Sequence, residues 1–192
     1  TGCMIIPAGP TEHRGGRGRG VIGAGALIPS GTAVNTLNLI TIATTGDATD
    51  FGDLSVGGAY RGGLASSTRG IFANVNGDTT YDYVTISSSG GAFDFGEAQT
   101  DHKGGATFNN SVRGFNAGGS DPSQTSNIRG MTIATKGSFF DAGDLTVTGI
   151  YMSGASSPTR GISFGGAVPT TTKNIDVFTM ASGGNAIKFG EL

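Results

Sequence analysis

The chain has 192 residues, enough for one compact domain, and its 36 glycines and 14% charged residues are atypical. The net charge of −2 gives no long-range attraction to nucleic acid or to an anionic membrane, so we expect neither as a partner. One cysteine excludes an intrachain disulfide, no apolar run is long enough for a transmembrane helix, and the glycine content disfavours helices, so an all-β fold is predicted.

The first predicted element is an apolar strand, Gly2 to Pro7, within TGCMIIPAG, which resembles TGIYMSGAS at residues 148–156. Its lone Cys3 is expected to be a small buried hydrophobe. The string HRGGRGRG that follows is similar to arginine-glycine segments that bind nucleic acid. The rest of the chain offers no basic face, so a flexible insertion before a strand is favoured. The start at Thr1 leaves open a segment upstream.

A repeat then runs through the chain. LITIATTGDATDFGDL at 39–54 returns as YVTISSSGGAFDFGEA at 83–98, GMTIATKGSFFDAGDL at 130–145 and VFTMASGGNAIKFGEL at 177–192. An Arg-Gly motif begins between these copies, at Arg19, Arg69, Arg113 and Arg160. We therefore expect one domain of four units, at about 9–60, 61–107, 108–154, and 155–192 together with 1–8.

The spacing of the two motifs separates rigid from variable parts. The distance from each turn glycine to the next Arg is constant, and length varies only between each Arg and the following turn glycine. Variable segments are typical of exposed loops. Four such loops are predicted: Ala24 to Val34, Asn74 to Thr80, Gly118 to Ser126 and Gly166 to Lys173.

Each unit predicts four short antiparallel strands. Two-residue hairpin turns are expected at Gly46-Asp47, Gly90-Gly91 and Gly184-Asn185, and a fourth strand at Ser55 to Tyr60 and Thr146 to Met152. Four such strands make one propeller blade, so a four-bladed β-propeller is predicted, with a β-solenoid as the rival fold. We expect the strand Gly2 to Pro7 to pair beside the strand ending at Leu192 and close the ring.

The unit of Arg-Gly, diglycine and an apolar-Asp pair resembles a kelch-type blade. Gly118-Gly119 and Gly165-Gly166 match the diglycine, and Tyr81-Asp82 and Ile175-Asp176 match the apolar-Asp pair. Gly25 and Val75 depart from the pattern, and kelch tryptophans are absent. The fuller repeat is similar to short repeats in structural proteins of marine bacteriophages, especially cyanobacterial ones. That resemblance implies a virion component.

The repeated polar positions are interpreted as structural. Carboxylates recur at Asp53, Glu97, Asp144 and Glu191, each three residues after Asp50, Asp94, Asp141 or Lys188. A catalytic pair is needed once, so recurrence favours turns or contacts between blades, with weak calcium binding as the alternative. The four repeated arginines favour bonds to neighbouring carbonyls, with a substrate-binding ring as the alternative. His13 and His102 have no recognisable catalytic partners.

The predicted function is therefore non-enzymatic, with no catalytic, metal or cofactor site. We expect a virion structural or attachment protein, in a tail, fibre or capsid decoration, whose loops contact other virion proteins or a host surface glycan. A secreted, extracellular lectin-like propeller is the second hypothesis. A polysaccharide-degrading propeller is the third, and the chain offers it no unique carboxylate pair.

Overall fold

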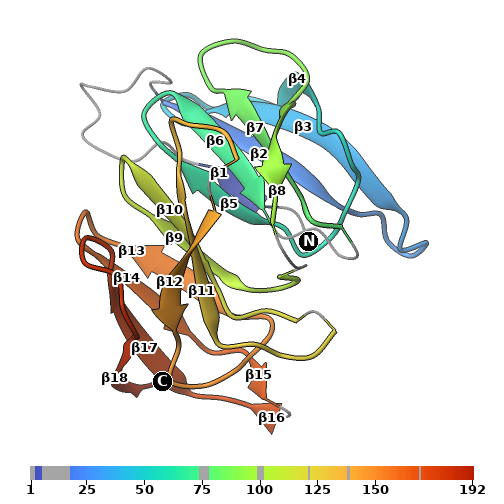
Figure 1. The fold of residues 1–192 in the computed structure, drawn as a ribbon. Helices are drawn as coiled ribbons and strands as arrows, with labels where there is room; N and C mark the ends of the chain where they lie inside the picture. Colours follow the sequence, from blue (N-terminus) through green and yellow to red (C-terminus); the bar gives the residue numbers. More distant parts are fainter. Residues whose placement is uncertain are drawn as a thin grey trace.

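The computed structural model describes residues 18–73, 78–98, 102–120, 122–137, 139–168 and 170–192, together with the backbone of one short strand at Cys3–Ile5. Every secondary-structure element in these residues is a β-strand, and none is a helix. The strands form four antiparallel sheets of four strands each and one two-stranded ribbon (Figure 1). The all-β prediction is confirmed, and the arrangement of the sheets is propeller-like.

Each sheet comes from one continuous stretch of the chain. The first sheet holds β1 (Cys3–Ile5), β2 (Arg19–Ala26), β3 (Ala33–Thr41) and β4 (Thr49–Asp53). The second holds β5 (Gly62–Ala65), β6 (Arg69–Ala73), β7 (Thr80–Thr85) and β8 (Phe93–Glu97). The third holds β9 (Ala106–Asn109), β10 (Arg113–Ala117), β11 (Asn127–Thr132) and β12 (Phe139–Asp144). The fourth holds β13 (Ser153–Ser156), β14 (Arg160–Phe164), β17 (Asn174–Thr179) and β18 (Ile187–Glu191), and its loop carries the ribbon β15 (Ala167–Val168) and β16 (Thr170–Thr171).

The predicted ring closure is wrong. β1 pairs antiparallel with β2 in the first sheet, with Met4 opposite Ile22, and β18 pairs with β17. The physical reason is proximity along the chain: in every unit the strand before the Arg-Gly strand pairs with it, as β5 does with β6 and β13 with β14. The likeness between the N-terminus and residues 148–156 was therefore real, but it marks the same position in another sheet.

Two local predictions are also corrected. The segments 55–60 and 146–152 are linkers, and the strands that they were expected to form begin later, at Gly62 and Ser153. The glycines Gly46, Gly90 and Gly184 do not sit in two-residue hairpin turns, because β3 ends at Thr41 and β4 begins only at Thr49, with the same spacing in the second and fourth sheets. In the second and fourth sheets this longer connection bonds to the fourth strand of the previous sheet, as Gly90 N does to Phe51 O and Gly184 N to Ala142 O.

The sheets pack face to face in sequence order. In Figure 1 the first two sheets overlap in the upper half, and the fourth lies at the lower left. Three buried clusters lie between neighbours. Phe72 and Ile86 of the second sheet pack with Val21 of the first. Met131 of the third packs with the second, and Phe178 of the fourth packs with the third. Among the described residues no buried cluster joins the fourth sheet to the first, so the stack is open.

Candidate contact surface

The repeated arginines connect one sheet to the next. Arg19 Nη1 donates to the carbonyl oxygen of Ile86 at 3.1 Å. Arg69 Nη1 donates to those of Ile133 and Ala134, both at 2.9 Å. Arg113 Nη1 donates to Met180 and Ala181 at 3.3 and 3.2 Å. In every case the acceptors follow the third strand of the next sheet, so these guanidinium groups bridge neighbouring sheets.

The repeated carboxylates have diverse surroundings. Asp53 and Glu97 are exposed, whereas Asp144 accepts a hydrogen bond from Ser126 Oγ at 3.1 Å. Glu191 pairs with Lys188 at 2.6 Å on the surface, and this contact lowers the pKa of Glu191 below its ordinary value. No group of three or more His, Cys, Asp or Glu side chains suited to a metal ion occurs in the part of the chain that the structure describes.

Among the described carboxylates two others, Asp82 and Asp176, are buried, at 0% and 1% exposure. A β-bulge in the third strand precedes each of them. Asp82 accepts bonds from Ser55 N and Oγ of the previous sheet's linker at 3.0 and 2.8 Å. Asp176 accepts the equivalent bonds from Thr146 at 2.8 and 2.6 Å. The signal in the sequence was an Asp inside an apolar strand, directly after Tyr81 or Ile175.

The linkers share a turn with a left-handed residue. Tyr60, Gly104 and Tyr151 hold the same place before the first strand of their sheets, with φ of +64°, +68° and +59°. Glycine adopts this conformation without strain, whereas a tyrosine there costs about 1 kcal/mol or more. Two of the three linkers thus carry a tyrosine at a position where glycine would adopt the same backbone conformation with less strain.

These tyrosines form an exposed cluster. The rings of Tyr60 and Tyr151 lie 5.4 Å apart between centroids, and Lys103 Nζ lies 5.1 Å from the Tyr60 ring. The tyrosines remain 40% and 52% exposed. A tyrosine offers an apolar ring face and a polar hydroxyl, so the cluster suits a ligand with both kinds of surface. Spacing alone could not have paired Tyr60 with Tyr151, because two linkers separate in sequence had to meet.

Three of the four variable loops lie at the same edge as these linkers. Gly25 N donates to Gly58 O at 3.0 Å, Gly119 N to Gly149 O at 2.7 Å, and Ala167 N to Ile150 O at 2.9 Å. In Figure 1 the β2–β3 connection projects at the right and the ribbon β15–β16 at the bottom. Parts of two predicted loops, 74–77 and 121, and one position of the last, 169, lie outside the described residues.

A groove of about 500 Å³ lies beside the last loop, lined by Val147, Thr170, Thr171, Thr172, Lys173, Asn174, Lys188 and Glu191. Hydroxyl, amide and charged groups thus line a shallow surface next to a variable loop. Such groups suit hydrogen bonds to a polar partner.

The described histidine, His102, does not extend this surface. His102 is 3% exposed, with Nδ1 at 2.9 Å from Gly118 O. His13 and the side chain of Cys3 lie outside what the structure describes. The described residues contain no helix long and apolar enough to cross a membrane. Comparison with protein-family models and with curated proteins gave no match for the chain.

Proposed function

We propose that the protein is a non-enzymatic structural or attachment component of a bacteriophage virion, in a tail, fibre or capsid decoration. The observation that carries the proposal is that the positions that join the sheets are separate from the loops that vary. The repeated Arg19, Arg69 and Arg113 bond to the backbone of the next sheet, while the polar loops at the linker edge vary in length. A rigid repeat with variable loops suits presentation of a contact surface to other virion proteins or to a host glycan.

The proposed fold type is four kelch-like blades in an open arc. The first strands β1, β5, β9 and β13 contact one another in that order, as the innermost strands of successive blades do. The support is this contact order, together with the diglycine positions Gly118-Gly119 and Gly165-Gly166, all of which have positive φ.

The test is localisation and loop exchange. Antibody against the chain is expected to label intact phage particles, and a reconstructed map is expected to place the loop edge outward or against a neighbouring protein. Exchanging Gly118 to Ser126 for a short Gly-Ser turn is expected to keep the fold and weaken attachment to the particle or host. Absence of the chain from purified particles contradicts the proposal, as does a point variant that keeps the fold and abolishes turnover of a substrate.

The second candidate function is glycan binding, outside or on a virion, and the exposed tyrosine pair favours it. Strain at Tyr60 and Tyr151 is typical of residues retained for a contact. Tyr60→Ala and Tyr151→Ala are each expected to weaken glycan binding on an array about tenfold. Val112→Ala, at an exposed apolar residue elsewhere, is the matched control. Equal binding by all three variants contradicts this second function.

A further inference from the structure

Every internal boundary between sheets is built from the same positions. We call the face of a sheet toward the next sheet its forward face, and the face toward the previous sheet its rear face. On the forward face of the first sheet, Val21 and Leu37 are 0% exposed and Phe51 is 2% exposed, because the second sheet covers them. The corresponding residues of the second sheet, Ile71 and Phe95, are equally buried.

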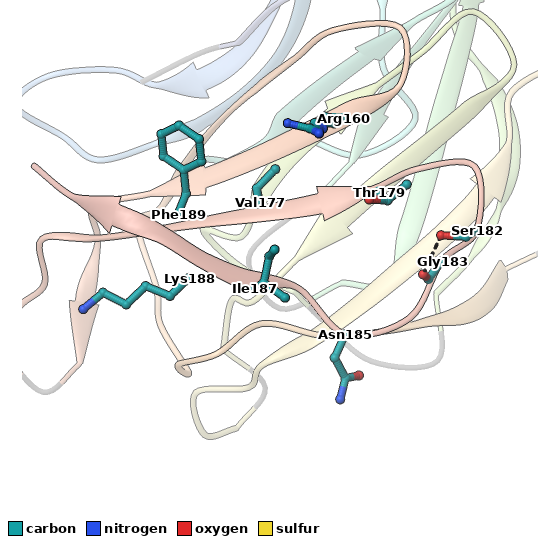
Figure 2. Close-up of a pocket in the computed structure, with 9 residues that line it drawn as sticks. All are labelled: Arg160, Val177, Thr179, Ser182, Gly183, Asn185, Ile187, Lys188 and Phe189. Carbon is teal, nitrogen blue, oxygen red and sulfur yellow. Dashed lines mark hydrogen bonds between the residues drawn. The ribbon is translucent and has the colours of Figure 1, made fainter.

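The forward face of the fourth sheet has the same pattern and no cover among the described residues. Phe189 and Leu192, which correspond to Phe51 and Leu54, are 67% and 66% exposed. Figure 2 shows Arg160, Val177 and Phe189 projecting from one side of the sheet. They line an open groove of about 310 Å³. Elsewhere in the chain, the burial of these positions stabilises a boundary between sheets.

The rear face of the first sheet is the complementary end. Ile40 and Ile42 there correspond to Phe178 and Met180 of the fourth sheet, which are 2% and 0% exposed beneath the third sheet. Ile42 is instead 49% exposed, and Ile40 is half-buried. The two ends of the stack thus expose the two opposite halves of one repeated boundary.

The arginine series stops at the same end. Arg19, Arg69 and Arg113 each bond to carbonyl oxygens after the third strand of the next sheet. Arg160 is exposed, and its guanidinium group, unlike those of the other three arginines, makes no hydrogen bond to another described residue. The matching acceptors at the other end are the carbonyls of Ile42 and Ala43, both on exposed residues. The guanidinium group of Arg160 and the carbonyl groups of Ile42 and Ala43 are therefore the donor and the acceptors that would complete the series, and they lie at opposite ends of the stack of sheets.

The repeated glycine near the end of each fourth strand also shows that the forward face of the fourth sheet is uncovered. A β-carbon at Gly52 or Gly143 would overlap the backbone of Gly90 or Gly184 in the next sheet, and one at Gly96 would lie 2.9 Å from the Cα of Gly137. At Gly190, the fourth member of the series, a β-carbon would meet nothing within 4 Å. The space that a following sheet's connection occupies at the other three glycines is open here.

We propose that the occupant is a second copy of this chain, which stacks its first sheet on the forward face of the fourth sheet. The apolar residues, the arginine with its carbonyl acceptors, and the glycine contact would then continue the internal boundary without change. The contact joins two different faces, so it is heterologous, and it produces a closed ring or a filament according to the rotation per chain. This inference is independent of the proposed virion role.

The test uses the intact chain and one variant blocked at each end. Sedimentation is expected to show concentration-dependent association of the unmodified chain. Phe189→Lys blocks the forward face and Ile42→Lys blocks the rear face, so each variant alone is expected to be monomeric, with a dissociation constant raised about tenfold or more. Mixed together, they retain one intact face of each kind and are expected to form a dimer with one chain of each variant.

The control is Val112→Lys, at a residue that is 57% exposed and lies between β9 and β10 of the third sheet, outside both end sheets. It is expected to associate like the unmodified chain, and circular dichroism must show the same fold for all variants. Three results overturn the proposal: an unmodified chain that stays monomeric, loss of association with Phe189→Lys but not Ile42→Lys, or two blocked variants that fail to combine. The second result would indicate a contact between like faces.

Discussion

At the scale of the residue, Asp82 and Asp176 are carboxylates buried at the boundaries between sheets, with acceptor oxygens bonded to the previous sheet's linker. Asp176 accepts hydrogen bonds from Thr146 of the previous sheet's linker and from Asn174 Nδ2 at 2.7 Å. Asp176→Ala is expected to lower the free energy of unfolding by about 2 to 3 kcal/mol, because buried donors lose a charged acceptor. Chemical denaturation measures this change.

Asp53→Ala is the matched control, since that carboxylate is exposed. Its effect is expected to stay within about 0.5 kcal/mol, as for most surface substitutions. An equal loss of stability from both substitutions would show that the carboxylate at the repeated turn is as important as the buried one.

Asp78 is expected to make the free energy of unfolding depend on pH in the acidic range. Thr80 donates to its carboxylate from Oγ1 at 2.6 Å and from the backbone N at 2.8 Å, and these bonds lower the pKa of Asp78 below its ordinary value. A carboxyl group whose pKa is lower in the folded chain stabilises it above the unfolded pKa of about 4, and this stability is lost as pH falls through the folded pKa.

We therefore expect the unfolding free energy to decrease below about pH 4, and Asp78→Asn to reduce that dependence slightly. Asn keeps an acceptor oxygen for Thr80 but does not titrate there. Urea unfolding at a series of acidic pH values measures the two slopes. Identical slopes for the two proteins would show that Asp78 does not contribute.

At the scale of the element, the glycine before the end of each fourth strand determines how closely two sheets approach. Gly143 has φ of +130°, and a β-carbon there would overlap Gly184 of the next sheet. Gly143→Ala is expected to cost about 2 kcal/mol or more in unfolding free energy, from strain and from separation of the sheets. Gly190→Ala, at the same place in the fourth sheet, is expected to be nearly neutral in dilute protein. Thermal melts of both variants make the comparison, and equal destabilisation would contradict it.

The sequence allowed the repeat, the β class and the Arg-Gly strands to be predicted, because apolar and β-branched residues recur with glycine at fixed spacing. Most of the features that the sequence did not predict depend on contacts between different repeat units. The linker of residues 55–60 looks like a strand, yet Tyr60 adopts a left-handed turn there. The strand Cys3–Ile5 resembles its counterpart near residue 153, but similarity alone does not choose which sheet it joins. The meeting of Tyr60 with Tyr151 depends on how the sheets stack.

At the scale of the whole molecule, stability is distributed over three boundaries between neighbouring sheets. Each buried cluster joins one pair of sheets, and the repeated Arg bonds also run only from one sheet to the next. A stack of this kind approximates a one-dimensional series in which each unit stabilises its neighbours. Opening at one end therefore leaves distant boundaries intact, whereas a closed ring would couple all of its boundaries.

This difference can be measured with one substitution at each end of the stack. Phe178→Ala removes a buried ring between the third and fourth sheets and is expected to cost about 3 to 5 kcal/mol at that boundary. Hydrogen exchange is then expected to accelerate in β14 and β17 and to remain slow in β6, because subglobal opening follows local contacts. Ile86→Ala, between the first and second sheets, should give the reverse pattern, with slow exchange retained in β14. Equal acceleration of every strand by either substitution would mean that the four sheets open as one unit, as expected for a closed ring and not for an open stack.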